Sequence, residues 1–388
     1  MVNVVVHFGG THEKPKLSLS ALGDIDNAKK NGRRASWWLA NNYLSRKSTP
    51  DVVLFGSSQL GGLQAADADL LNSTQDYVLN HECVSVERQL KQEHLPASCF
   101  AIGMVGSMIS DHYLISRVLF SPQNSPKLMV VTVSPRDFID SKLPSVTSTE
   151  VFRFFSPYIS DSTVSADLLT DPVEKISWYA TNMPIRNAWR GGRIESDSVE
   201  KLGPSGEQSN KPMQRISQDP LLTTNNESMA LIRPGQCVVT PHMADFFVDN
   251  STDYKKRYSS SHGPMYKRQF DCFSKLLSAA NAQGISVLVV GMPLDASNWS
   301  LLPATFWQDY RGRLQTACAK NGCAFVEWSH DAAFGRGDFV DGVHLNARGG
   351  GKLAQKIAQA ISQAPTIVAA LGGSETRAKL ADVRTIDQ

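Results

Sequence analysis

Ser58 is the first residue of the chain whose surroundings suggest covalent chemistry. It stands in Gly56-Ser57-Ser58, directly after the apolar run 52–55, and a helical pattern begins at Gln59. A serine in a turn between a strand and a helix lies close to the exposed N–H groups of that helix, where negative charge is stabilised. The same pattern is also typical of a plain turn that caps a helix. A nucleophilic role for Ser58 therefore requires a base and an oxyanion hole elsewhere in the chain.

The stretch Asp341-Gly342-Val343-His344 supplies the acid and base that Ser58 would need. An aspartate three residues before a histidine can set its carboxylate against Nδ1 of the imidazole and leave Nε2 facing a serine. By itself such a loop is often a surface turn. Together, however, the two stretches predict a catalytic triad of Ser58, His344 and Asp341, with His344 as the general base.

Alternating apolar runs and helical patterns predict the elements that must position these residues. The expected strands cover 52–55, 97–102, 127–133, 284–291 and 323–328, and the expected helices cover 35–44, most of 60–95, 109–119, 265–282, 301–320, 348–362 and a short stretch after Pro365. Strands that alternate with helices indicate an α/β fold with a parallel sheet. Because loops after such strands converge at one edge, Ser58, Gly106 and Arg136 should be neighbours.

The segment 139–263 interrupts this alternation. It is rich in Ser, Thr, Asn, Asp and Pro and contains a loop-like stretch at 203–212, but it also holds large aromatic residues. We interpret it as an insertion that folds over the sheet edge as a lid or substrate platform, since a bare linker would lack so many apolar anchors. The expected division of the chain is an N-terminal connector and helix at 1–50, a first core part at 51–138, the insertion at 139–263, a second core part at 264–364 and a C-terminal tail at 365–388.

These motifs resemble those of the SGNH (GDSL-type) hydrolase superfamily. Gly56-Ser57-Ser58 stands at the family's GDS motif, the stretch 102–107 resembles its glycine block, and 341–344 matches its DxxH block. The Gly-Ser-Ser opening is similar to the cell-envelope branch, which includes teichoic-acid D-alanylation and alginate O-acetylation proteins. The resemblance covers about 51–138 and 265–362. It implies a flavodoxin-like parallel sheet flanked by helices, and an oxyanion hole that includes the backbone N–H groups of Ser58 and Gly106.

Arg136 stands where the family usually has the asparagine that completes its oxyanion hole. Three roles are open for this arginine. It can act as a further oxyanion donor, it can bind a carboxylate or uronic acid as a two-pronged fork, or it can pair with Asp137 or another acid without a catalytic role.

The resemblance implies a serine esterase or O-acyltransferase that acts on small, acetyl-type esters of an extracellular or cell-envelope polysaccharide. The expected partner is an acylated carbohydrate, and the expected location is extracytoplasmic. An alternative is a catalytically silent SGNH-like protein that binds glycan or organises an assembly. An unrelated nucleotide-binding α/β protein is disfavoured, because the chain has neither GxGxxG nor GxxxxGK[ST].

Composition argues against two other classes. The 388 residues carry a formal net charge of +2 with 20% charged residues, which does not favour a nucleic-acid partner. The six cysteines form no CxxC pair and no cysteine–histidine spacing typical of zinc, so neither a metal nor another cofactor is expected. Cys99 and Cys323 lie in apolar stretches and are expected to be buried.

The apolar start, residues 1–8, is shorter than a signal peptide or a transmembrane helix. It is either a strand or the remainder of a longer hydrophobic anchor. The expected routes to a membrane are such an anchor or a partner membrane acyltransferase.

Two further groups of polar residues are expected to be structural. His242 and Asp245 resemble an acid–base pair, but a solvated loop is the simpler interpretation. Asp67 and Asp69 are expected to lie on a solvated helix face.

Overall fold

Five runs of aliphatic and β-branched residues form the strands of one sheet. They are β1 (Val52–Gly56), β3 (Cys99–Gly103), β4 (Leu128–Val133), β6 (Ser286–Gly291) and β7 (Ala324–Glu327). All four pairings between neighbouring strands are parallel. The computed structural model describes residues 14–143, 145–169, 171–182, 231–242, 246–260 and 263–372. The prediction of an α/β fold with a parallel sheet is confirmed.

Helices alternate with these strands along the chain. In the part of the chain that the structure describes they are α1 (Leu19–Leu22), α2 (Ile25–Asn31), α3 (Ala35–Leu44), α4 (Gly61–Leu71), α5 (Val84–Gln92), α6 (Ile109–Leu119), α7 (Glu150–Phe155), α8 (Asp161–Thr163), α9 (Pro172–Asn182), α11 (Ser251–Arg257), α12 (Pro264–Ala282), α13 (Ala296–Trp299), α14 (Ala304–Lys320), α15 (Ala347–Ser362) and α16 (Pro365–Ala370). The segment 60–95, predicted to be mainly helical, holds two helices with the short strand β2 (Gln75–Asp76) between them. α4 ends where Asn72 adopts a left-handed conformation, with φ of 47°.

The strand order β3-β1-β4-β6-β7 is that of a flavodoxin-like sheet. From β1 the chain crosses to β3 on one side, and from there it returns to β4 on the other side of β1. In folds of this kind, ligands bind at the carboxyl ends of the two strands where the winding reverses. Ser58 follows β1 and Arg136 follows β4, so both residues stand at that edge.

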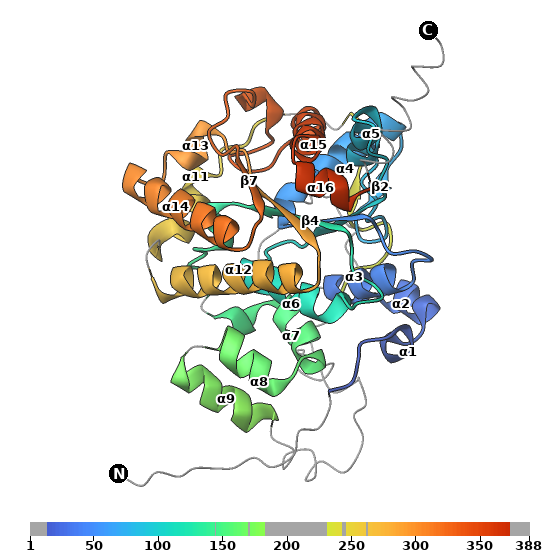
Figure 1. Cartoon of the computed structure of the whole chain (residues 1–388), viewed down its shortest axis with the longest axis vertical. Helices are drawn as coiled ribbons and strands as arrows, with labels where there is room; N and C mark the ends of the chain where they lie inside the picture. The colour runs from blue at the N-terminus through green and yellow to red at the C-terminus, as the bar shows by residue number, and fades with distance from the viewer. Residues whose placement is uncertain are drawn as a thin grey trace, which may run out of the picture.

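Alternate residues of each strand face opposite sides of the sheet, as the pleat requires. Val53 and Phe55 belong to a hydrophobic cluster with α3, α6, α12 and α14. Val52 and Leu54 belong to a second cluster with α4, α5, α15 and α16. Figure 1 shows α6 and α12 together on one side of the sheet and α4, α5, α15 and α16 on the other. Strands buried on both faces explain why these runs are apolar throughout.

Two glycines allow α15 to touch the beginning of α4. A Cβ atom at Gly350 would lie 1.7 Å from the carbonyl oxygen of Gly62, so no larger residue fits there without movement. α15 buries one aliphatic face against the same cluster as α4. Because α4 follows the turn that carries Ser58 and α15 follows His344, this close contact sets the two loops beside each other.

The described parts of the segment 139–263 contact the core at separate places. α7 packs against α3 and α6, and two of the predicted aromatic anchors are buried there, Phe152 and Phe155. β5 (Val238–Val239) pairs antiparallel with β2. Farther along, the N–H of Val248 donates to the carbonyl of Val340, one residue before Asp341. The loop predicted at 203–212 lies outside the described residues.

Candidate active site

Ser58, His344 and Asp341 form a continuous chain of hydrogen bonds. Ser58 opens a short 3-10 turn (Ser58–Leu60) directly after β1, and its Oγ lies 2.8 Å from Nε2 of His344. Nδ1 of His344 lies 2.7 Å from Oδ2 of Asp341. A carboxylate accepts only, so Nδ1 is the ring nitrogen that carries the proton in a neutral imidazole, and Nε2 accepts from the Ser58 hydroxyl. This is the polarity that a general base requires.

Asp341 is fully buried, with an exposed fraction of 0%. Its Oδ1 accepts hydrogen bonds from the backbone N–H groups of Val343 and His344, both at 2.8 Å. Burial alone would raise the pKa of Asp341, but the charge and hydrogen bond of His344 and the two N–H groups outweigh burial, and the pKa is lowered. The carboxylate therefore stays ionised at neutral pH and holds the imidazole in one orientation.

The loop around Asp341 is held by elements from three parts of the chain. Gly342 donates its N–H to Oδ1 of Asn250, at 3.2 Å, and accepts from the N–H of Asp295, at 3.1 Å. On the far side of His344, Asn346 caps α15 through a 3.0 Å hydrogen bond from the N–H of Gly349. Asp341 and His344 are thus positioned by hydrogen bonds that involve backbone groups, as well as by packing.

The loop after β3 lies against the loop after β1. The N–H of Met104 donates to the carbonyl of Gly56 at 3.1 Å, which places Gly106 close to the Ser58 turn. Within the described residues, the backbone N–H groups of Ser58 and Gly106 donate to no protein acceptor. Two unsatisfied N–H groups beside a serine that is hydrogen-bonded to histidine can receive the negative charge of a tetrahedral intermediate.

Arg136 reaches the same loop, as predicted from strand order, but it meets carbonyl groups there. Its Nη2 donates to the carbonyl of Gly106 at 2.9 Å, and its Nη1 donates to the carbonyl of Ser107 at 2.5 Å. Its Nε donates to Asp140 at 3.1 Å, whereas its Nη1 lies 3.7 Å from Oδ1 of Asp137. The acid that Arg136 binds directly is therefore Asp140 and not Asp137, the neighbour named from the sequence.

A second serine–histidine pair lies beside the first, and no sequence pattern singles it out. Ser107 Oγ and His112 Nε2 are 3.1 Å apart, and both residues are buried. Burial lowers the pKa of His112 to about 3, and its Nδ1 has no hydrogen-bond partner within the described residues. His112 stands five residues after Ser107 and no carboxylate follows it, so the pair forms no recognisable catalytic motif in the sequence.

Tyr254 is another residue that the sequence does not mark. It lies in α11 with an exposed fraction of 9%, and the Arg257 guanidinium lies 5.8 Å from the centre of its ring. Burial, with the nearby charge of Asp341, raises the pKa of Tyr254 above its usual range. The phenol therefore stays protonated close to Asp341.

The other polar residues considered from sequence have simpler surroundings. The prediction for Asp67 is wrong, because its side chain is buried and its carboxylate caps α5 by accepting from the N–H groups of Val84 and Ser85. Asp69 accepts a 2.7 Å hydrogen bond from the backbone N–H of His242, and its Oδ1 lies 3.7 Å from Nδ1 of that histidine, whose side chain is exposed as expected. Asp245 lies outside the described residues.

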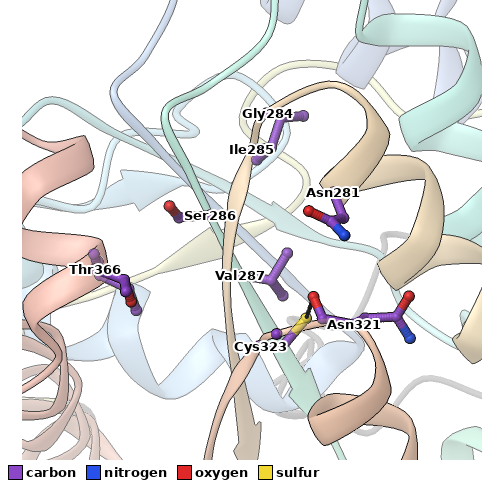
Figure 2. A pocket seen from close by; sticks show the side chains of 10 residues that line it. Asn281, Gly284, Ile285, Ser286, Val287, Asn321, Cys323 and Thr366 are labelled. Atoms are coloured by element: carbon purple, nitrogen blue, oxygen red, sulfur yellow. Dashed lines mark hydrogen bonds between the residues drawn. The ribbon is translucent and has the colours of Figure 1, made fainter.

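Of the two cysteines expected to be buried, Cys99 is fully buried and Cys323 is half-buried. Cys323 lines a surface hollow of about 160 Å³ at the amino end of β6, together with Asn281 and Thr366 (Figure 2). A second hollow, of about 410 Å³, lies along α12 and is lined by Asp271 and Lys275, among others. No residue of the predicted triad lines either hollow.

No protein-family model matches the chain, and no curated protein matches its sequence. Among the described residues, no helix is both long and apolar enough to cross a membrane. The same residues contain no group of three or more histidine, cysteine, aspartate or glutamate side chains that would hold a metal ion. The arrangement around Ser58 is therefore the feature from which a function can be inferred.

Proposed function

We propose that this chain is an SGNH-type serine esterase or O-acyltransferase that acts on small, acetyl-type esters. The observation that carries the proposal is the unbroken hydrogen-bond chain from Ser58 through His344 to the buried, ionised Asp341. A serine hydroxyl is a weak nucleophile unless an adjacent base removes its proton. His344, Asp341 and two backbone N–H groups that have no protein acceptor among the described residues lie at one edge of the sheet, which supports this role.

In the proposed reaction, Ser58 Oγ attacks the ester carbonyl and His344 Nε2 takes the hydroxyl proton. The carbonyl oxygen becomes an oxyanion, which the N–H groups of Ser58 and Gly106 stabilise. Collapse of this intermediate breaks the bond to the leaving alcohol, which receives the proton from His344 and leaves an acyl group on Ser58. Attack by water then yields a carboxylic acid, whereas attack by a sugar hydroxyl yields a new ester.

The proposed substrate is an acylated polysaccharide of the cell envelope, and the proposed location is extracytoplasmic. The support is the order of the three motifs, their resemblance to the cell-envelope branch of the SGNH superfamily, and the flavodoxin-like strand order. The described end of the segment 139–263 contacts the loop of Asp341 through Val248 and Asn250. This contact supports the proposal that the insertion covers the site and governs whether water or a hydroxyl acceptor reaches the acyl group.

Trapping of an acyl-enzyme tests the proposed function. We expect p-nitrophenyl acetate to give a burst of nitrophenol and a mass increase of one acetyl group on Ser58, and neither in Ser58→Ala. Added oligosaccharides that shorten the life of this adduct and become acetylated would identify a transferase, while loss to water alone would identify an esterase. A folded wild type that forms no adduct and still binds acetylated glycan would favour a silent binding protein instead.

A further inference from the structure

The loop that supplies the N–H of Gly106 is a tight turn. The N–H of Ser107 donates to the carbonyl of Met104 at 3.1 Å, and Gly106, the third residue of this turn, has φ of 75°. A positive φ at that position distinguishes a type II turn from a type I turn, and the two types differ by a flip of the central peptide. The N–H of Gly106 belongs to that central peptide. The form of the turn therefore decides whether this N–H can serve as an oxyanion donor.

Arg136 binds the carbonyl groups at the end of this turn. One guanidinium nitrogen donates to the carbonyl of Gly106 and another to the carbonyl of Ser107, and only 8% of the arginine side chain is exposed. A planar guanidinium holds two acceptors in a fixed relative position, which a single ammonium group does not. The arginine thus restrains the two peptide groups that follow the Gly106 N–H.

Arg136 is itself held in place from the other side. Its Nε donates to Oδ2 of the buried Asp140, and Nη1 of Arg257 donates to the same oxygen at 2.6 Å. Arg257 lies in α11 and also binds Asp253 through Nε, at 2.7 Å. A buried carboxylate between two arginines is a strongly coupled group, so loss of one partner leaves charges unpaired. This chain of ion pairs connects α11 to the turn beside Ser58.

We propose that Arg136 is a positioning residue that holds the Met104–Ser107 turn so that the N–H of Gly106 stays directed at the oxyanion. The inference rests on the proposed function, because an oxyanion forms only if Ser58 attacks an acyl group. In the described structure the arginine donates to carbonyl groups and to Asp140, and this favours positioning over direct donation or substrate binding.

Arg136→Lys tests this role while keeping a positive charge beside Asp140. A lysine offers one nitrogen, so it cannot hold both carbonyls and the carboxylate together. We expect kcat for an aryl acetate to fall about 10- to 100-fold, somewhat less than the loss of a whole oxyanion donor, and KM to stay within about threefold. The midpoint of the acid limb of kcat/KM should not move, since Ser58 and His344 are untouched. Arg313→Lys, an exposed arginine that binds Asp309, is the matched control.

Hydrogen exchange measured by mass spectrometry reports on the turn itself. We expect amides of residues 104–108 to exchange faster in Arg136→Lys than in wild type, and the strands of the sheet to stay protected. A double variant, Arg136→Gln with Asp140→Asn, removes both charges of this ion pair together. It controls for misfolding caused by leaving the buried Asp140 charge without Arg136. It should show the same loss of kcat and the same faster exchange.

Either of two results would overturn the positioning role. The first is an unchanged kcat in the lysine variant, which would indicate substrate binding if KM rises. The second is a lost kcat with unchanged exchange at 104–108, which would indicate direct donation. The proposed function fails separately: in that case wild-type protein itself forms no acyl-enzyme on Ser58 and shows no turnover.

Discussion

The two serine–histidine pairs at the sheet edge differ in surroundings much more than in distance. Ser58 and His344 are 2.8 Å apart, and Ser107 and His112 are 3.1 Å apart. Ser58 is half-buried, and its histidine is backed by the ionised Asp341. Ser107 is buried, and the outer nitrogen of His112 has no partner in the described part of the chain.

This difference shows which features make a serine–histidine contact suitable for catalysis. A general base must accept a proton and keep its imidazolium stable, and for this it needs a carboxylate behind it and access to substrate. Burial holds the pKa of His112 at about 3, so its ring stays neutral and cannot store a proton. Under the proposed function, the Ser58–His344 pair carries out the chemistry and the Ser107–His112 pair supports the turn that contains Gly106.

Loss of the base should give the largest change in activity. We expect His344→Ala to lower kcat for an aryl acetate by about 10⁴- to 10⁶-fold, because among the described residues His344 is the one side chain hydrogen-bonded to Ser58 Oγ. Steady-state hydrolysis with a circular dichroism check of folding measures this. His242→Ala, which changes an exposed histidine, is the control and should keep wild-type kcat. A His344→Ala variant within tenfold of wild type would mean that the pair is not catalytic.

Loss of the carboxylate should have the next largest effect. Asp341→Asn keeps the shape of the side chain but donates where His344 Nδ1–H now donates, which favours the wrong tautomer. We expect kcat to fall about 10³- to 10⁴-fold with KM nearly unchanged. Asp69→Asn, at the exposed contact with His242, is a matched control. Equal kinetics in Asp341→Asn and wild type would remove the distinction between the two histidines.

The buried His112 should affect the free energy of unfolding and not the catalytic activity. Above pH 6.5 both the folded and unfolded states carry neutral His112, whereas below it the unfolded state binds a proton that the folded state does not bind until about pH 3. The free energy of unfolding must therefore fall as the pH is lowered through this window. Between pH 6.5 and pH 4 this amounts to about 3 kcal/mol.

Replacement of the histidine tests that assignment. Urea unfolding at pH 7.5 and pH 4 should show that His112→Leu loses less stability on acidification than wild type does, by about the amount given by linkage. Identical pH dependence in wild type and His112→Leu would show that His112 is protonated in the folded protein, and the two pairs would then be alike.

The smallest expected effect is that of Ser107→Ala. The variant loses the hydrogen bond between Ser107 Oγ and His112 and the longer one, of 3.5 Å, from Ser107 Oγ to the carbonyl of Gly56, while its backbone carbonyl still accepts from Arg136. We expect the free energy of unfolding to fall by about 1 kcal/mol and acyl-enzyme still to form on Ser58. Chemical denaturation and intact mass together measure this. Loss of the acyl-enzyme in a folded Ser107→Ala protein would transfer the catalytic role to the second pair.

Much of the fold and the central contact of the site could be predicted because their signals are local. The strand that precedes Ser58 and the three-residue spacing of Asp341 and His344 are short patterns with direct physical meaning. The partners of Arg136 could not be predicted, since its carbonyl acceptors lie about thirty residues away and depend on how β3 and β4 are placed in the sheet. Asp67 was misjudged for the same reason, because the helix it caps begins 17 residues later.

The most direct test of the central claim is the intact mass of the protein after treatment with a fluorophosphonate serine probe. The measurement compares wild type with Ser58→Ala and His344→Ala, and it includes Ser107→Ala as the variant of the second pair. Our account predicts one adduct on wild type and on Ser107→Ala, and none on the other two. An adduct on Ser58→Ala, or no adduct on folded wild-type protein, would contradict the assignment of Ser58 as an activated nucleophile.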